Sequence, residues 1–151
     1  MNEVRERKRV GIIGGSQPKP YQLDLAYQVG QLIAKKGGLL VCGGLGGVME
    51  AAARGAKEAG GLTIGVLPGI NYQEANPYID FPLATGLGHA RNVLVVLNSD
   101  VLIAIGGEYG TLSEIAFGRI YGRKIISLDS WDIPGVIKAR TPEEACELAW
   151  L

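Results

Sequence analysis

Residues 101–114, VLIAIGGEYGTLSE, decide the fold class of this 151-residue chain. The five apolar residues 101–105 are typical of a strand buried on both faces of a sheet. A glycine-rich turn follows at residues 106–110, and residues 111–121 then have the apolar spacing of a helix. A buried strand that leads through glycines into a helix is the repeating unit of parallel α/β sheets.

The same alternation recurs in both directions from this segment, with no linker or internal repeat between units. We therefore expect one domain over residues 1–151, a three-layer α/β/α Rossmann-like domain with a doubly wound, mostly parallel sheet. The predicted strands are residues 10–13, 39–42, 63–67, 101–105 and 124–128, and the predicted helices are 21–36, 48–59, 89–98, 111–121 and 141–151.

The composition limits the partners that this protein can have. Fifteen Lys and Arg residues balance fifteen Asp and Glu residues, so we expect neither a nucleic-acid nor a membrane partner. No apolar run approaches the ~20 residues of a membrane span, and two cysteines are too few for a disulfide framework, so we expect a cytoplasmic protein. With His89 as the sole histidine and no paired cysteine motif, we expect no metal site.

Glycine is in excess, at 23 of the 151 residues, about twice its usual share of roughly 7%. Gly37-Gly38 and Gly60-Gly61 have the position of helix terminators. The other clusters, at residues 14–15, 43–47, 86–88 and 106–110, lie where a strand ends and a helix begins. In a parallel sheet these junctions share one edge, where ligands of open α/β sheets bind.

Glycines at this edge let backbone N–H groups approach an anion, and helix N-termini add partial positive charge. We therefore predict a cleft for a phosphorylated small molecule. Ser16 is either a turn residue or a phosphate-contacting hydroxyl. The predicted ligand-binding residues are Gly14, Gly15, Ser16, Gly43, Gly44, Gly46, Gly47, Gly106, Gly107, Gly110 and Thr111. The named phosphate motifs are absent: there is no P-loop, and Met49 occupies the third glycine position of the dinucleotide fingerprint.

Two charged residues have both a structural and a functional interpretation. Glu114 stands three residues after Thr111, which fits a capping box, but it also follows the glycine-rich turn at the predicted binding edge. The same pattern recurs at Thr141 without a glycine turn before it. Arg91 is either a solvated arginine or a clamp on phosphate, and His89 is either a helix cap or a second anion contact.

The residues 43–49, Gly43-Gly44-x-Gly46-Gly47-Val48-Met49, together with residues 106–114, resemble the cytokinin-activating phosphoribohydrolases, a Rossmann-like superfamily often mislabelled as lysine decarboxylases. Within that superfamily, Gly86-Leu87-Gly88-x-Ala90-Arg91-Asn92 is similar to the branch related to the molybdenum cofactor carrier protein. Two departures from the enzyme pattern are Ile105 in place of proline and residues 88–92, which lack a glutamate and a lysine.

The resemblance implies roles for particular residues. Arg91 and Glu114 match the catalytic arginine and glutamate of the phosphoribohydrolases, and Gly107, Gly110 and Thr111 would hold a 5′-phosphate. It also implies a homodimer or a higher homo-oligomer, built from the helix that begins at Val48 or the one that contains Ile115, Ala116 and Ile120.

Three functions stay open at this stage. The first is binding of a phosphorylated nucleotide-like ligand, a molybdenum cofactor or a purine nucleotide, with no cofactor required. The second is a nucleoside 5′-monophosphate phosphoribohydrolase, and the third is a structural or regulatory module whose glycines only make turns. Lysine decarboxylation is rejected, because neither Lys57 nor Lys124 follows a strand end where it could form a Schiff base. Residues 68–82, with Tyr72 and Tyr78, either cover the site or connect two elements.

Overall fold

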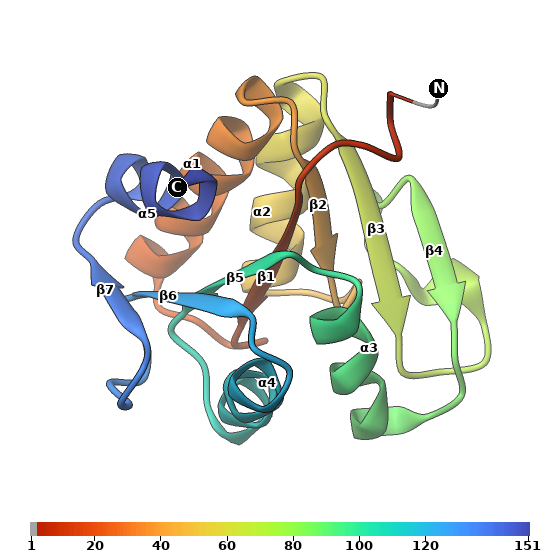
Figure 1. Ribbon diagram of the computed structural model, residues 1–151. Coiled ribbons are helices and arrows are strands. Elements are labelled where there is room, and N and C mark those ends of the chain that lie inside the picture. Colours follow the sequence, from red (N-terminus) through yellow and green to blue (C-terminus); the bar gives the residue numbers. More distant parts are fainter. Residues whose placement is uncertain (1–2) are drawn as a thin grey trace.

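Seven parallel strands form one sheet in the computed structural model, which describes residues 3–151 (Figure 1). Met1 and Asn2, part of the expected 1–151 domain, lie outside the described residues. The strand order is β4-β3-β2-β1-β5-β6-β7, so the order reverses between β1 and β5. The strands are β1 (Arg9–Gly14), β2 (Leu39–Cys42), β3 (Leu62–Leu67), β4 (Phe81–Ala84), β5 (Val101–Ile105), β6 (Lys124–Leu128) and β7 (Ile137–Ala139).

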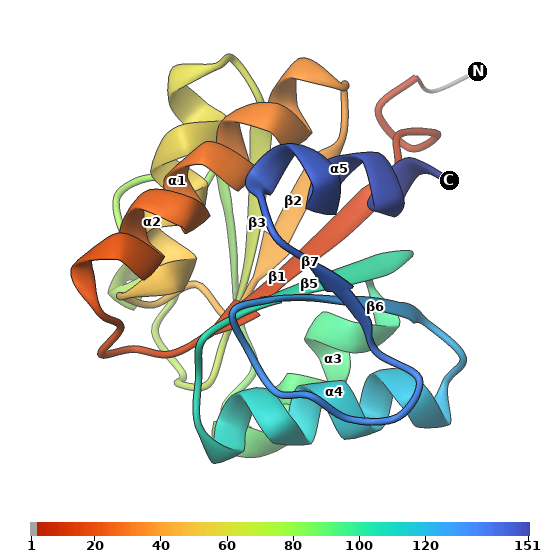
Figure 2. The same ribbon diagram turned by 90° about the vertical axis from the view of Figure 1, so that its left-hand side faces the viewer.

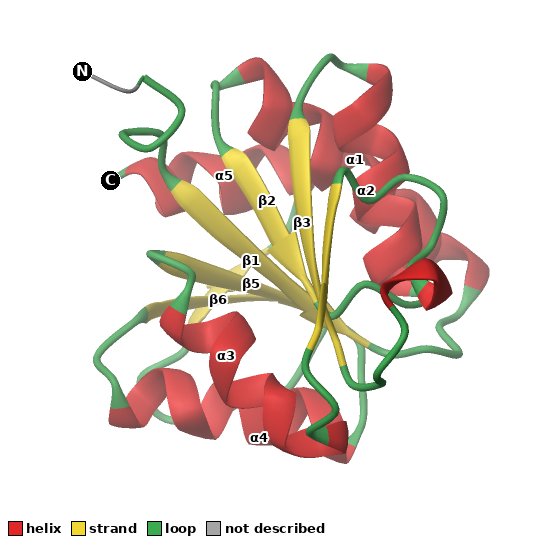
Figure 3. Ribbon diagram, turned by 90° about the vertical axis from the view of Figure 1, so that its right-hand side faces the viewer, coloured by secondary structure: helices red, strands yellow, loops and turns green. Residues whose placement is uncertain are grey.

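Helices cover both faces of the sheet, as Figures 2 and 3 show. On one face lie α1 (Pro20–Lys35), α2 (Val48–Glu58) and α5 (Pro142–Trp150), and on the other lie α3 (Asn92–Leu97) and α4 (Tyr109–Ile120). Two short 3₁₀ turns, η1 (Tyr72–Glu74) and η2 (Gly88–Arg91), lie in the connections. The predicted α/β/α Rossmann-like fold, doubly wound on a parallel sheet, is confirmed.

The apolar runs of the strands supply two cores, because successive side chains point to opposite faces. In β5, Ile103 and Ile105 pack toward α1, α2 and α5, whereas Leu102 and Ala104 pack toward α3 and α4. All five residues of β5 are buried. Continuous burial on both faces is the reason that this strand is apolar throughout rather than alternating.

Helices α1 and α2 approach closely through glycine. A Cβ atom added to Gly30 would lie 2.0 Å from the Ala52 carbonyl oxygen, and one added to Gly55 would lie 2.0 Å from the Tyr27 carbonyl oxygen. Both helices end as predicted at glycine pairs: the Gly38 N–H donates to the Ile33 carbonyl at 2.9 Å and the Gly61 N–H to the Ala56 carbonyl at 2.8 Å.

The start of α4 differs from the prediction. The helix begins at Tyr109, two residues early, and its N-cap Glu108 makes no side-chain cap. Thr111 therefore lies inside the first turn, and the capping-box interpretation of Thr111 and Glu114 is wrong. The physical reason is the left-handed backbone at Gly106 and Gly107, with φ of 57° and 94°, which completes the turn before residue 108. At the other capping pattern, the Glu144 N–H donates to the Thr141 hydroxyl at 3.1 Å.

Three other elements depart from the prediction. The edge strands β4 and β7 were not predicted, since each is short and partly exposed. The single helix expected at residues 89–98 is instead the turn η2 followed by α3. The Ala90 N–H donates to the carbonyl of Leu87, three residues before it, at 3.2 Å, so the chain makes a 3₁₀ turn before the α-helix begins.

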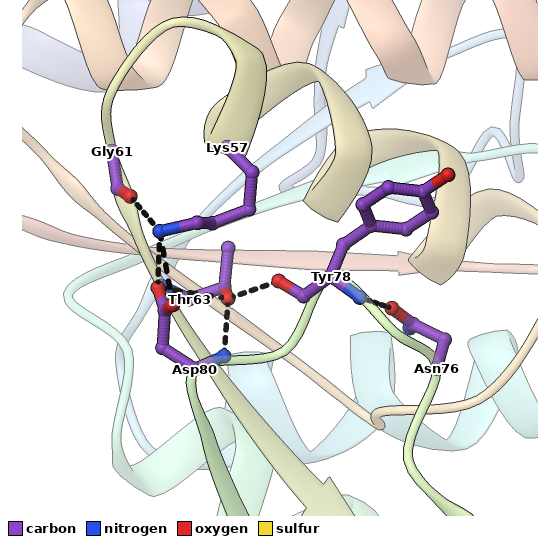
Figure 4. Close-up of polar contacts among 6 residues, drawn as sticks. All are labelled: Lys57, Gly61, Thr63, Asn76, Tyr78 and Asp80. Atoms are coloured by element: carbon purple, nitrogen blue, oxygen red, sulfur yellow. Dashed lines mark hydrogen bonds and ion pairs between the residues drawn. The ribbon is translucent and has the colours of Figure 1, made fainter.

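The connection from β3 to β4 is held by a polar network at the amino edge of the sheet (Figure 4). The Asp80 carboxylate forms an ion pair with Lys57 at 2.9 Å and accepts the Thr63 backbone N–H at 3.0 Å. The Thr63 hydroxyl donates to the Tyr78 carbonyl at 2.6 Å, and the Tyr78 N–H donates to Asn76 Oδ1 at 3.0 Å. Lys57 is thus engaged at the edge opposite the strand ends that carry the glycines.

Candidate functional site

A cleft of about 930 Å³ opens at the carboxyl edge of the sheet, where the strand order reverses. The chain leaves β1 toward α1 on one face and leaves β5 toward α4 on the other, so the two loops diverge above the sheet. Their backbones are close at the base: a Cβ atom on Gly15 would lie 3.4 Å from Gly107 Cα. This is the position at which open α/β sheets bind ligands.

The cleft brings together most of the predicted site residues from four separate loops. Arg91 and Glu114 line it, as do Gly14, Gly15, Ser16, Gly43, Gly106, Gly107, Gly110 and Thr111. Gly44, Gly46 and Gly47 do not line it. Most of the glycine loop after β2 packs against other segments, as four contacts show.

Asn76 holds this loop from the β3–β4 connection. Its backbone N–H donates to the Gly44 carbonyl at 2.9 Å, and its side-chain amide donates to the Leu45 carbonyl at 2.9 Å. Gly47 has φ of 70° and packs against Gly15: a Cβ atom added to Gly47 would lie 2.4 Å from the Gly15 carbonyl oxygen. The first N–H of α2, at Val48, donates to that same carbonyl at 3.0 Å. A role for Gly44, Gly46 and Gly47 in ligand contact stays a prediction.

The N-terminus of α4 faces the cleft directly. Leu112 makes the first N–H bond back along the helix, to the Glu108 carbonyl at 3.0 Å, so the N–H groups of residues 109–111 have no intrahelical acceptor. Tyr109, Gly110 and Thr111 all line the cleft, and α4 has no side-chain cap. Unpaired N–H groups and the positive end of the helix dipole together make an anion site.

Arg91 is buried, with 8% of its surface exposed, so the expectation of a solvated arginine is wrong. Its Nε donates to the Val66 carbonyl at 2.9 Å and its Nη2 to the Gly43 carbonyl at 3.4 Å, at the ends of β3 and β2. Its Nη1 donates to Asn92 Oδ1. Burial lowers the pKa of Arg91, whereas the nearby Glu114 raises it. No carboxylate of residues 3–151 lies within ion-pair distance of the guanidinium.

Glu114 projects from α4 one turn after Gly110 and is 8% exposed. Burial raises the pKa of its carboxyl to about 8, and the positive charge of Arg91 opposes that rise. None of the described residues donates a hydrogen bond to this carboxyl. Since every side-chain oxygen and nitrogen of these residues that is closed to solvent has a hydrogen-bond partner, the Glu114 oxygens must be open to solvent. The carboxyl oxygens are therefore directed to the space in the cleft. Cys42, at the end of β2, is buried as well, and burial raises the pKa of its thiol to about 12.

Residues after β6 line the cleft as well, and the sequence analysis missed them. Asp129, at φ of 60°, accepts hydrogen bonds from the Tyr21 hydroxyl at 2.5 Å and from Gln22 Nε2 at 3.0 Å. The Ser130 hydroxyl donates to the Gly106 carbonyl at 2.6 Å, and Trp131 follows it. Their position after the predicted strand 124–128 indicated the same edge of the sheet, but the prediction of ligand-binding residues used glycine clusters and this turn has none.

Residues 68–82 do not line the cleft, so this segment connects β3 to β4 and is not a cover over the site. Tyr72 is 57% exposed on the outside of that connection. His89 does line the cleft, at its exposed mouth. Within residues 3–151, no group of three or more His, Cys, Asp or Glu side chains could hold a metal ion. None of the helices in this range is long and apolar enough to cross a membrane.

This fold and site define a doubly wound α/β protein with an anion-binding geometry at its topological switch point. The chain belongs to the SLOG cluster4 family, whose sequence model matches residues 7–149. The predicted resemblance to the phosphoribohydrolase superfamily and its molybdenum cofactor carrier branch is confirmed by this match and by the relatives below.

Two solved structures are similar along nearly the whole chain. The molybdenum cofactor binding protein of Rippkaea orientalis is 42% identical, with a TM-score of 0.90, and the match covers 95% of both chains. The molybdenum cofactor carrier protein of Chlamydomonas reinhardtii is 34% identical, with a TM-score of 0.89, and the match covers 96% of this chain and 97% of that one.

A relative that is named as an enzyme matches a smaller share of both proteins. The cytokinin riboside 5′-monophosphate phosphoribohydrolase of Mycobacterium tuberculosis is 34% identical over 119 residues, which is 72% of this chain and 63% of that protein. This chain thus spans less than two thirds of that relative's length. Together, the relatives support a role in binding or hydrolysing a nucleotide-like ligand.

Proposed function

We propose that this protein binds a phosphorylated, nucleotide-like ligand in the cleft, with the phosphate on the N-terminus of α4. The observation that carries the proposal is the arrangement of two positive groups around one space. The uncapped N–H groups of residues 109–111 and the buried guanidinium of Arg91 both border the cleft, and both attract an anion.

The backbone geometry supports the same placement. Gly107 has φ of 94°, and a Cβ there would lie 2.1 Å from Thr111 Oγ1, so only glycine leaves the approach to the helix N-terminus clear. We propose that Gly107, Gly110 and Thr111 contact the phosphate. Gly15 and Ser16 border it from the β1 loop, and Gly43 supports Arg91 from the β2 loop.

The names of the relatives point to two ligands. The two structural neighbours favour the molybdenum cofactor, and the phosphoribohydrolase favours a purine nucleotide. Because the described residues offer no cluster of metal-binding side chains, a molybdenum cofactor would be held as cargo through its phosphate and ring. No cofactor of its own is proposed for this protein.

The second candidate is a nucleoside 5′-monophosphate phosphoribohydrolase, and the unpaired carboxyl of Glu114 favours it. Water would add to the ribose C1′ as the bond from C1′ to the base nitrogen breaks, and the electron pair would leave with the base. The Glu114 carboxylate would stabilise the developing positive charge and take a proton from the water, and this proton would then pass to the nitrogen of the leaving base. The products are the free base and ribose 5-phosphate, and Arg91 would orient the substrate.

Calorimetric titration of AMP separates these functions when combined with an assay for released ribose 5-phosphate. We expect AMP to bind without release of base, and Arg91→Lys to weaken binding about tenfold or more, because lysine lacks the planar fork. Arg54→Ala, on the exposed face of α2, is the matched control and should bind normally. Turnover that Glu114→Ala abolishes would replace the binding proposal with the hydrolase. If neither nucleotides nor the molybdenum cofactor bind, both proposals are rejected.

A further inference from the structure

The cleft extends to both sides of the proposed phosphate position. In the sheet order β2-β1-β5-β6, the loop after β2 carries Gly43 on one side of β5, and the loop after β6 carries Asp129 on the other. Arg91 and Glu114 belong to the first side. Nothing proposed so far uses the second side, although it lines the same cleft of about 930 Å³, near the upper end of the ~300–1,000 Å³ of small-molecule sites.

Two aromatic rings lie on this second side. The ring centroids of Tyr109 and Trp131 are 6.2 Å apart, with 39° between the ring planes, which is within the usual range for aromatic pairs. The Trp131 indole N–H donates to the Glu108 carbonyl at 3.1 Å, so its ring is fixed to the start of α4. Tyr109 is 79% exposed although it is a large ring at the mouth of a cleft.

A carboxylate lies beside the rings in a fixed orientation. Asp129 Oδ2 accepts both the Tyr21 hydroxyl and Gln22 Nε2, whereas Oδ1 accepts no hydrogen bond from the described residues. The backbone of Asp129 is held too, because its carbonyl accepts the Gly106 N–H at 3.0 Å. A left-handed non-glycine residue is strained and persists where its surroundings hold it. The hydrogen bonds from Tyr21 and Gln22 also keep the pKa of Asp129 below its ordinary value.

From these contacts we infer a second nucleoside subsite, formed by Tyr109, Trp131 and Asp129, on the β6 side of the phosphate. This inference rests on the proposed phosphate position. The aromatic pair offers a surface for a planar base, and the free Oδ1 of Asp129 accepts hydroxyl groups of a sugar, as strand-end acids do in dinucleotide sites. The negative charge of Asp129 disfavours further phosphates there, so the ligand class is a dinucleotide joined through a pyrophosphate.

The test compares ADP with diadenosine diphosphate by calorimetric titration of the full chain, because the two ligands share a pyrophosphate and differ in the second adenosine. We expect diadenosine diphosphate to bind about tenfold more tightly, since stacking of one base on aromatic side chains has an effect of that order. Tyr109→Ala should remove most of this gain, and Asp129→Asn should reduce it severalfold. Asp129→Asn should not change the ADP affinity more than about twofold, because Asp129 lies on the second side only.

Two further points separate a loss of binding from misfolding and from effects outside the cleft. Tyr109 is exposed, and asparagine tolerates the left-handed backbone of Asp129, so both variants should fold. Tyr72→Ala, an exposed tyrosine outside the cleft, should leave both affinities unchanged. In Trp150→Phe, Trp131 becomes the sole tryptophan, and its fluorescence should respond to diadenosine diphosphate more strongly than to ADP.

Equal affinities for the two ligands, or a gain that survives Tyr109→Ala, would overturn the second subsite while leaving the proposed function intact. An equal loss of ADP and diadenosine diphosphate affinity in Tyr109→Ala would also overturn it, because the first base would then lie on these rings. If neither ADP nor diadenosine diphosphate binds, the second subsite is overturned, and the proposed function fails as well if AMP and the molybdenum cofactor do not bind either.

Discussion

At the residue scale, Arg91 and Glu114 show how one cleft holds a buried guanidinium and a buried carboxyl without an ion pair. Arg91 uses its donors on two carbonyls and an amide, whereas the Glu114 carboxyl has no protein donor. A buried carboxyl without donors favours its neutral form. Both groups therefore retain capacity for a ligand, which a direct ion pair would have used.

The titration of Glu114 predicts how stability depends on pH. The folded pKa of about 8 lies above the ordinary carboxyl value of 4.5, so the folded state holds the proton more tightly than the unfolded state. Its contribution to stability is present below about pH 4.5 and is lost as the pH rises through about 8. We expect Glu114→Gln to remove this loss, at up to about 1.4 kcal/mol per pH unit within that window.

Denaturant unfolding of both proteins at several pH values measures this effect. The difference in unfolding free energy should be small near pH 4 and should grow in favour of Glu114→Gln up to about pH 8. Parallel pH profiles of the two proteins would contradict a raised pKa of Glu114.

The glycine at position 107 gives a second prediction at this scale. Gly107→Ala requires a left-handed alanine and forces its Cβ onto the Thr111 side chain. We expect a loss of about 1–3 kcal/mol in unfolding free energy, with weaker AMP binding. Gly122→Ala is the matched control, since Gly122 has a left-handed backbone at φ of 69° outside the cleft and a Cβ there meets no atom within 4 Å, so AMP binding should be unchanged. If both variants behave alike, the proposed approach of phosphate past Gly107 is wrong.

At the element scale, the glycine loops divide into two kinds. The loop after β5 leaves N–H groups open to the cleft, whereas the loop after β2 is held by Asn76 and by contacts with Gly15. Both loops have the same glycine-rich composition. Which of them offers donors to a ligand depends on the segments that pack against them, and Asn76 lies 32 positions away from Gly44.

The packing of α1 on α2 predicts the effect of a single methyl group. Gly55→Ala improves helix propensity by about 1 kcal/mol, but its Cβ would lie 2.0 Å from the Tyr27 carbonyl oxygen. We expect the clash to dominate and the unfolding free energy to fall by about 1–3 kcal/mol. Urea denaturation measures this change, and a more stable variant would show that the two helices separate easily.

At the scale of the whole molecule, the homo-oligomer stays a prediction, but the structure changes which residues could form its interface. Ile115, named with the α4 helix as a contact candidate, is 1% exposed in the core, and the α2 helix buries most of its apolar residues. Ala116 and Ile120 stay exposed on α4, the latter at 70%. An interface on α4 would therefore use these outward residues.

Light scattering tests this assembly. We expect a mass of twice 16.0 kDa or a higher multiple. Ile120→Glu should shift it to the monomer without loss of the folded state, because Ile120 is exposed and a charge is costly in an apolar interface. A single species at the monomer mass for the unaltered chain would reject the prediction.

Much of the architecture could be predicted because it depends on local patterns. The five predicted strands are present with small shifts at their ends, and the glycine pairs at 37–38 and 60–61 end helices. The edge strands β4 and β7 were missed because a short strand such as Phe81–Ala84 is defined by its neighbour's hydrogen bonds rather than by its own residues. Its sequence contains a proline and has three exposed positions.

The sequence by itself determined the buried parallel strands, the edge on which the cleft lies, and the presence of Arg91 and Glu114 at that edge. Periodicity and turn chemistry are local, so they can be read along the chain. Only the tertiary structure decided that Arg91 is buried, that Gly44, Gly46 and Gly47 do not line the cleft, and that Asp129 and Trp131 do. Burial and direction depend on which distant segments pack together, and a single segment does not encode them.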